Sequence, residues 1–413
     1  MSVLFRRRAV EADSDLRFGD TDTSGGQRPY DKTTIRERFK HFTWAWFTVS
    51  MSTGGLAILL AETPHQFQGL ITIGKIVYIF DILTFLGAVG GITTRFILLP
   101  GSFYRSLEHP TESLFVPTAF LAALNVLSCA QIYGAPSTGP WLVDALRVLF
   151  WVYSAATFLL CVFMYWYLFA APPKRLTIEN MMPSWNLPAF PCMLSGTFAS
   201  IIAPSQPPEH RMAIIVAGLT FQGLGWMVSF IMDTMYLHRL VQYGLPTPNL
   251  RPGMFIAVGP PSFTSLALIG LARAISPDFD YFATHPYALE ILQTMALFVA
   301  IFLWSLAFWF FCISALSVLH GLRRMSFHLV WWAIVFPNVG FTIATIDIGE
   351  QLGSQGILWV GSAMTVLLVV AWVLVMAFNI KAVLKRQIMM PGVDEDKDEW
   401  IQADKEAESS VRR

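Results

Sequence analysis

Residues 331–349 read WWAIVFPNVGFTIATIDIG, a run apolar enough to cross a lipid bilayer but interrupted by the pair Phe336 and Pro337. A proline inside a helix removes one backbone hydrogen bond and clashes with the carbonyl four residues earlier, here that of Ala333. Hydrocarbon offers no water to such a carbonyl, so irregular backbone is tolerated only where it packs in protein or lines a watery cavity. The run therefore predicts a kinked membrane helix that faces the protein interior.

The composition of the whole chain predicts a polytopic membrane protein. Of its 413 residues, 54% are hydrophobic and 14% are charged, whereas soluble domains carry about a quarter charged residues. The formal net charge is zero, so nothing favours a nucleic-acid partner. The cysteines lie in apolar stretches without paired or metal-ligand spacing, so we expect neither a disulfide nor a metal site. They are Cys129, Cys161, Cys192 and Cys312.

Ten apolar segments are long enough to span a bilayer, which takes about 20 residues. They lie at residues 42–60, 71–98, 114–132, 141–170, 183–203, 211–241, 252–275, 288–319, 327–346 and 354–382. All but four of the 28 lysines and arginines then fall on one side of the membrane, the exceptions being Lys75, Arg147, Arg211 and Arg273. Because basic residues accumulate in the cytoplasm, both ends of the chain are expected there.

Polar tails flank the membrane region. Residues 1–40 and 387–413 are rich in charge and poor in apolar periodicity, so we expect both tails to be disordered and cytoplasmic. Residues 41–386 then form one ten-helix transmembrane domain.

A repeat runs through the odd-numbered spans. The third, fifth, seventh and ninth spans each carry a proline in the first half, followed by small and hydroxyl residues. These prolines, Pro117, Pro191, Pro261 and Pro337, are 74, 70 and 76 residues apart, which fits a repeated two-helix hairpin. The first span lacks the proline but keeps SMSTGG at residues 50–55. The pattern predicts an inner ring of five odd helices inside five longer even helices. The alternative is that the small residues serve only to let helices pack closely.

Several stretches resemble the tellurite-resistance/dicarboxylate transporter family, which includes plant slow anion channels and fungal malate and sulfite transporters. They are WWAIVFPNVGFTIATIDIG, GPPSFTSLALIGLA and FPCMLSGTFASIIA. The finer likeness, carried by SMSTGGLA and VGPPSFTSLAL, is to fungal malic acid (C4-dicarboxylate) transport proteins. The resemblance covers roughly residues 40–385. It implies an all-α fold of five helical hairpins in quasi-fivefold arrangement, odd helices around one pore per subunit, a homotrimer, and a pore-blocking phenylalanine that maps onto Phe336.

Donor side chains on the odd helices are candidates for binding an anion, whose transfer out of water is otherwise very costly. Arg273 is the one basic residue within an odd span, and intramembrane arginines usually mark a pathway. Its alternative role is to reach the outer headgroups. The neutral candidates are Ser52, Thr53, Asn125, Ser195, Thr197, Ser262 and Thr264, although each by itself fits helix packing as well.

A helical wheel of the opening run separates a possible gate from a polar stripe. Phe336, Ile343 and Asp347 share one face with Gly340, whereas Asn338, Thr342 and Thr345 share the opposite face. We expect Phe336 in the pore and the Asn/Thr face bonded to neighbouring helices.

Two carboxylates, Asp81 and Asp233, fall within even spans, where ionisable side chains are functional candidates. Proton coupling is one role for them. The other is a structural pair with Lys75, Arg239 or His238.

No nucleotide-binding or hydrolase motif occurs in the sequence, so we expect no enzyme, no cofactor and no ATP-driven pump. The leading hypothesis is a plasma-membrane secondary transporter of C4-dicarboxylates such as malate and succinate, gated by Phe336, with proton coupling left open. The alternatives are a channel or exporter for chloride, nitrate or sulfite, and a membrane receptor or scaffold that acts through its tails.

Overall fold

The computed structural model describes residues 34–170, 177–285 and 287–390, and these ranges contain helices and no strand. Except for residues 34–40 and 387–390, the two predicted tails lie outside the described ranges. The α-helices are α2 (Ile35–Phe39), α3 (Phe47–Glu62), α4 (Leu70–Leu98), α5 (Ser102–Glu108), α6 (Val116–Cys129), α7 (Trp141–Ala170), α8 (Phe190–Ile202), α9 (Pro208–Tyr243), α10 (Gly259–Ala274), α11 (Asp280–Thr284), α12 (Ala288–Gly321), α13 (Phe336–Gln351) and α14 (Gln355–Leu384).

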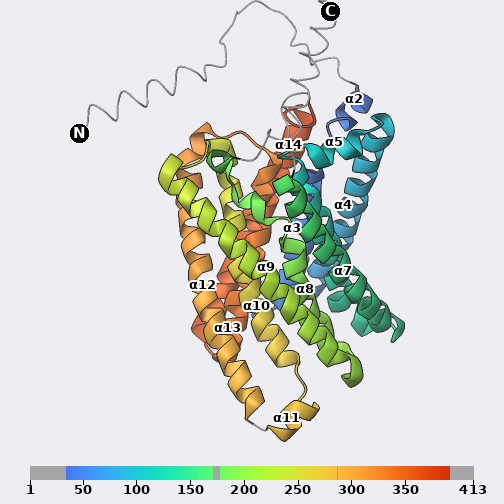
Figure 1. Cartoon of the computed structure of the whole chain (residues 1–413), viewed down its shortest axis with the longest axis vertical. Coiled ribbons are helices and arrows are strands. Elements are labelled where there is room, and N and C mark those ends of the chain that lie inside the picture. The colour runs from blue at the N-terminus through green and yellow to red at the C-terminus, as the bar shows by residue number, and fades with distance from the viewer. Residues whose placement is uncertain (1–33, 171–176, 286, 391–413) are drawn as a thin grey trace, which may run out of the picture. The chain divides into compact units, whose positions relative to one another are not determined.

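Nine helical segments of the described residues are long and apolar enough to cross a membrane. They coincide with nine of the ten predicted spans. At the fifth predicted span the apolar helix, Phe190–Ser205, is shorter. Figure 1 shows α9 beside α8 and α10, and α12 beside α10. The helical content and the spans agree with a polytopic membrane protein.

Burial separates alternate helices of the chain. In the segments that contain α3, α6, α10 and α13, 67% to 89% of the most apolar window is buried, against 22% to 33% for α4, α7, α9, α12 and α14. Most of α8 is buried as well. Among the described residues, the helices at the odd predicted spans are therefore interior, and the helices at the even predicted spans face the surroundings.

The interior helices contact one another in a closed order. Helix α3 packs on α6, α6 on α8, α8 on α10, α10 on α13, and α13 again on α3. The outer helices pack against them, α4 on α3, α7 on α8, α9 on α8 and α10, α12 on α10, and α14 on α13. The quasi-fivefold symmetry of the five predicted hairpins stays a prediction.

The four repeated prolines begin helices instead of kinking them. Pro117, Pro191, Pro261 and Pro337 lie in the first turns of α6, α8, α10 and α13. The first four N–H groups of a helix have no intrahelical partner, so a proline there removes no helical hydrogen bond. The expected kink within an α-helix is wrong, because the backbone before α10 and α13 is 3₁₀-helical, in η9 (Pro248–Val258) and η11 (Leu329–Ile334).

Side chains bond the carbonyls of the turn that leads into α13. Asn338 donates through Nδ2 to the carbonyl of Ile334 at 2.7 Å. Ser52 on α3 donates through Oγ to the carbonyl of Trp332 at 3.2 Å. Two carbonyls at this interruption thus have donors within the protein, whereas Oδ1 of Asn338 and Nε1 of Trp332 are buried without a hydrogen-bond partner among the described residues.

Candidate functional site

Two cavities lie between the interior helices, and Phe336 lines both of them. The wide cavity has a volume of about 340 Å³, and the narrow cavity about 20 Å³. No other described residue lines both cavities, and the Phe336 side chain is only 2% exposed. Its ring is therefore part of the wall that separates the two spaces.

Each interior helix presents one stripe of side chains to the wide cavity. The stripes follow steps of three and four residues, which place their members on one helical face. They are Gly55, Ile58 and Glu62 on α3; Asn125 and Ser128 on α6, continued by Ile132; Leu194, Thr197 and Ile201 on α8; Leu266, Gly270 and Arg273 on α10; and Phe336, Val339, Ile343 and Asp347 on α13. The charged members lie near the C-terminal helix ends, whereas Phe336 begins its helix. Charge is thus concentrated at one end of the cavity and the aromatic wall at the other.

The ring of Phe336 is held between α10 and α3. It stacks on the ring of Phe263 with centroids 5.0 Å apart and planes 28° apart. On the α3 side, a Cβ at Gly55 would lie 3.1 Å from Cδ2 of Phe336. The ring can approach the α3 backbone this closely because residue 55 is a glycine.

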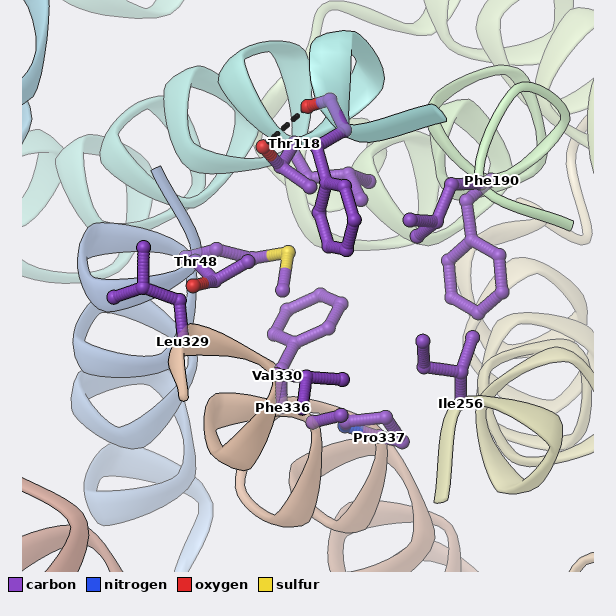
Figure 2. Close-up of a pocket in the computed structure, with 13 residues that line it drawn as sticks. Thr48, Thr118, Phe190, Ile256, Leu329, Val330, Phe336 and Pro337 are labelled. Atoms are coloured by element: carbon purple, nitrogen blue, oxygen red, sulfur yellow. Dashed lines mark hydrogen bonds between the residues drawn. The ribbon is translucent and has the colours of Figure 1, made fainter. Parts of the chain in front are cut away.

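The narrow cavity is apolar and is bounded by the beginnings of interior helices. Figure 2 shows Thr118 of α6, Phe190 of α8 and Pro337 of α13 around it, with the Phe336 ring projecting into it. The hydroxyl of Thr118 donates to the carbonyl of Phe115 at 2.6 Å and so is not free to bind a ligand. Helix N-termini carry a partial positive charge, which makes this otherwise apolar space electrostatically favourable to an anion.

Arg273 faces carboxylates at the far end of the wide cavity. It donates to Glu350 at 3.2 Å and 3.3 Å and to Asp347 at 3.4 Å. Glu62 lines the same cavity. Sequence reasoning singled out Arg273 but missed the neutralising carboxylates, although Asp347 appeared on the Phe336 face of the wheel. The cation expected to receive an anion is thus already paired in this structure.

The neutral candidates divide into two groups. Asn125 and Thr197 line the wide cavity. The others lie outside its lining, and their hydroxyls donate to backbone carbonyls: Ser52 to Trp332, Thr53 to Val49, Ser195 to Pro191, Ser262 to Val258 and Thr264 to Pro260. Most of these bonds return to the residue four positions earlier, a common arrangement of helical Ser and Thr. Substrate contact by any of these residues stays a prediction.

Polar residues that sequence reasoning did not select also line the wide cavity. Besides the carboxylates, they are Ser128, Gln131 and Ser200. Ser128 and Ser200 lie three residues after Asn125 and Thr197, so helical spacing from those two candidates would have found them. Gln131 belongs to the π-helical turn η4 (Ala130–Gly134), which ordinary α-helical spacing does not describe.

The two intramembrane carboxylates have neutral partners. Asp81 accepts a hydrogen bond from Oγ of Ser50 at 2.6 Å, and Asp233 accepts one from Nδ2 of Asn186 at 2.7 Å. Both side chains are buried. The alternative of a pair with Lys75, Arg239 or His238 is wrong for the described residues, where no such ion pair forms.

Comparison with known proteins identifies related chains over most of this length. The profile of the voltage-dependent anion channel family matches residues 41–380. The chain is similar to the malic acid transport protein of Schizosaccharomyces pombe, with 37% identity over 88% of this chain and 83% of the relative. A putative malic acid transport protein from that yeast is 36% identical over 88% of this chain and 85% of the relative. A sulfite efflux pump of Arthroderma benhamiae is 26% identical over 82% of this chain and 90% of the relative.

Proposed function

Because the chain belongs to the voltage-dependent anion channel family, we propose that it is a secondary transporter that moves C4-dicarboxylates such as malate and succinate across a membrane. Two relatives described as malic acid transport proteins match it at 36% and 37% identity, which supports a dicarboxylate substrate. Family membership indicates a transport protein and not an enzyme.

The observation that carries the proposal is the position of Phe336 between two cavities enclosed by interior helices. We propose that the cavities are the two halves of one pore within each protomer and that the Phe336 ring is its gate. In the observed state the ring is buried against Phe263 and Gly55, which corresponds to a closed gate. Displacement of one side chain would join the two halves.

The charges along this path support a carboxylated substrate. We propose that a substrate carboxylate replaces Glu350 or Asp347 as the partner of Arg273, which donates to both at 3.2–3.4 Å. Asn125 and Thr197 then offer neutral polar groups deeper in the wide cavity. Beyond Phe336, the helix N-termini around the narrow cavity favour negative charge. Each stage of the path thus offers an anion some compensation for lost hydration.

The remaining features of the proposal come from the sequence. We propose five helical hairpins in quasi-fivefold arrangement, a homotrimer in the plasma membrane, and cytoplasmic tails at residues 1–40 and 387–413. Residues 41–386 then form the transport domain.

Uptake of radiolabelled malate into liposomes that contain the purified protein tests the proposal. We expect malate uptake above that of empty liposomes and competition by succinate. Measuring uptake with and without an imposed pH gradient also tests proton coupling. No malate flux under any gradient would end the dicarboxylate proposal.

A second candidate function is a channel or exporter for small inorganic anions. It is favoured by the similarity to the sulfite efflux pump of Arthroderma benhamiae, which is 26% identical. Bilayer recordings distinguish the two functions. Unitary chloride or sulfite currents that persist without dicarboxylate would support the channel, and their absence beside malate uptake would support the transporter.

A further inference from the structure

The carboxyl group of Asp81 is fully buried between the outer helix α4 and the interior helices α3 and α6. Its Oδ1 accepts from Ser50, and its Oδ2 is buried without a hydrogen-bond partner among the described residues. The titratable groups near it are the phenol of Tyr78 on α4 and the thiol of Cys129 on α6. Ser50 and Gly54 face the carboxyl from α3. None of these neighbours is a cation, and no cation among the described residues adjoins Asp81.

Two adjacent glycines of α3, Gly54 and Gly55, lie between this carboxyl and the Phe336 ring. A Cβ at Gly54 would lie 2.5 Å from Oδ2 of Asp81, and a Cβ at Gly55 would lie 3.1 Å from the ring of Phe336. Successive residues of an α-helix point about 100° apart, so the two glycines present different faces. The α3 backbone is therefore in contact with the carboxyl on one face and with the aromatic ring on another.

We propose that Asp81 is a positioning residue that couples its own protonation to the Phe336 gate through Gly54 and Gly55. With the proton bound, α3 stays against the ring and the gate is closed. When the proton leaves, α3 shifts and the ring loses its support. The inference rests on the proposed gating role of Phe336.

The direction of this coupling follows from hydrogen-bond requirements. An ionised carboxylate has two oxygens that need donors when it is buried, and the closed arrangement supplies a donor to one of them. A neutral carboxyl in the same place needs fewer hydrogen-bond donors, so its burial there costs much less. Ionisation therefore favours an arrangement in which Oδ2 gains a donor. Asn125 lies on this side, since its Cβ is 2.7 Å from the position of a Cβ at Gly54, and it borders the wide cavity. In the closed arrangement its Nδ2 donates to the carbonyl of Met51 at 2.6 Å, so it becomes the donor to Oδ2 only when that bond breaks.

Efflux of radiolabelled malate from proteoliposomes, measured at a series of pH values equal on both sides, tests the proposal. In the unmodified protein we expect flux to rise with pH by at least about fivefold, the lower end of typical coupling between sites. Asp81→Asn, which cannot ionise, is expected to keep the low flux at every pH. Asp233→Asn is the matched control, because Asp233 is also a buried carboxylate on an even span but bonds to Asn186. It should retain the full pH dependence.

Phe336→Ala separates failure of this inference from failure of the gate. A high, pH-independent flux in Phe336→Ala, together with an unmodified pH response in Asp81→Asn, would overturn the role of Asp81 and leave the gate standing. If Phe336→Ala conducts no better than the unmodified protein, the gate itself is wrong, and with it the inference.

Ser50→Ala provides a second test if Asp81→Asn does not fold. It removes the donor to Oδ1, which stabilises the ionised carboxylate. We expect the midpoint of the flux–pH curve to move to higher pH by up to about one unit, the equivalent of one hydrogen bond. An unchanged midpoint in well-folded Ser50→Ala would contradict the proposal.

Discussion

Phe336 of α13 and Phe263 of α10 stack with their ring centroids 5.0 Å apart, although 73 positions separate them in the sequence. Such an aromatic pair contributes roughly 0.5–1.5 kcal/mol beyond the area that it buries. Under the proposed function, opening the pore breaks this stack. The relative position of α10 and α13 then influences how often the ring moves aside.

Replacing Phe336 by alanine should make the protein leak small anions in the absence of dicarboxylate. We expect chloride flux to rise at least about tenfold, which corresponds to a barrier lower by about 1.4 kcal/mol. The control is Phe341→Ala on the same helix. Phe341 is also 2% exposed but stacks on Trp304 at 5.3 Å and lines neither cavity. Both variants lose stability, since truncating a buried phenylalanine costs about 3–5 kcal/mol. A leak of equal size in the two would point to loosened packing and not to a gate.

Replacing Arg273 by alanine should weaken dicarboxylate transport. The change leaves Glu62 and Asp347, which line the wide cavity, and Glu350 without their cation. We expect the KM for malate to rise about tenfold or more, since charges in contact near a protein surface interact by a few kcal/mol. Initial uptake rates against malate concentration measure the effect. Arg147→Ala is the control, because Arg147 pairs with Asp144 of α7 at 2.8 Å outside the cavity.

Glu350→Gln should act in the opposite direction to Arg273→Ala. The amide removes a negative charge from Arg273 but leaves the guanidinium in place. We expect a lower KM for malate, with the difference shrinking as salt screens the exposed charges. An unchanged KM in this variant and in Arg273→Ala would show that the cluster does not contact substrate.

Gly55→Ala should loosen the gate by a smaller amount than Phe336→Ala. The added methyl would lie 3.1 Å from the Phe336 ring, tighter than ordinary van der Waals contact, so the ring must shift. We expect chloride flux between that of the unmodified protein and that of Phe336→Ala. Gly87→Ala on α4 is the matched control, because a Cβ there meets nothing within 4 Å. The gate's support from α3 would be disproved by equal fluxes in the two glycine variants.

Glu112→Gln should lower stability without changing substrate affinity. Arg95 donates to Glu112 through both terminal nitrogens, and the two side chains are 2% and 0% exposed. Removing one member of a buried ion pair typically costs about 3–5 kcal/mol. Thermal unfolding followed by tryptophan fluorescence measures the loss. Asp144→Asn, which breaks an exposed pair, should cost about 1 kcal/mol or less. A changed KM in Glu112→Gln would mean that this pair shapes the pore.

The division into interior and outer helices could be read from the sequence because the two environments make opposite demands. Bulky apolar side chains suit the lipid side, and Phe302 of α12 is 76% exposed. Glycines and hydroxyls suit close contact between helices, and Gly340 of α13 packs directly beneath the Phe263 ring. The polar face of α13 also follows the wheel. Thr345 accepts from Nε1 of Trp304 on α12, and Phe336 lines the cavities. The expected bonds to neighbouring helices are wrong for Asn338 and Thr342, which donate to carbonyls of their own segment.

The role of the prolines and the pairing of Arg273 could not be read from the sequence. A proline such as Pro337 suits both a kink and a first helical turn, and the choice depends on whether the preceding residues pack as a 3₁₀-helix. Arg273 meets Asp347 and Glu350 across 74 and 77 positions of chain. Such a contact depends on how two helices are rotated and staggered against each other. Local spacing carries no information about that.

The unequal volumes of the two cavities have an electrical consequence. Under the proposed function, the wide cavity admits water and ions and therefore conducts, whereas the Phe336 ring and the apolar space beyond it insulate. The potential across the membrane would then fall mostly over this short insulating stretch. Moving one elementary charge through the whole potential involves about 2.3 kcal/mol per 100 mV. A dianion carries two charges, so the electrical energy is twice as large, and most of it would change while the anion passes the Phe336 side chain. Its transport rate should therefore depend steeply on voltage at the step where Phe336 moves.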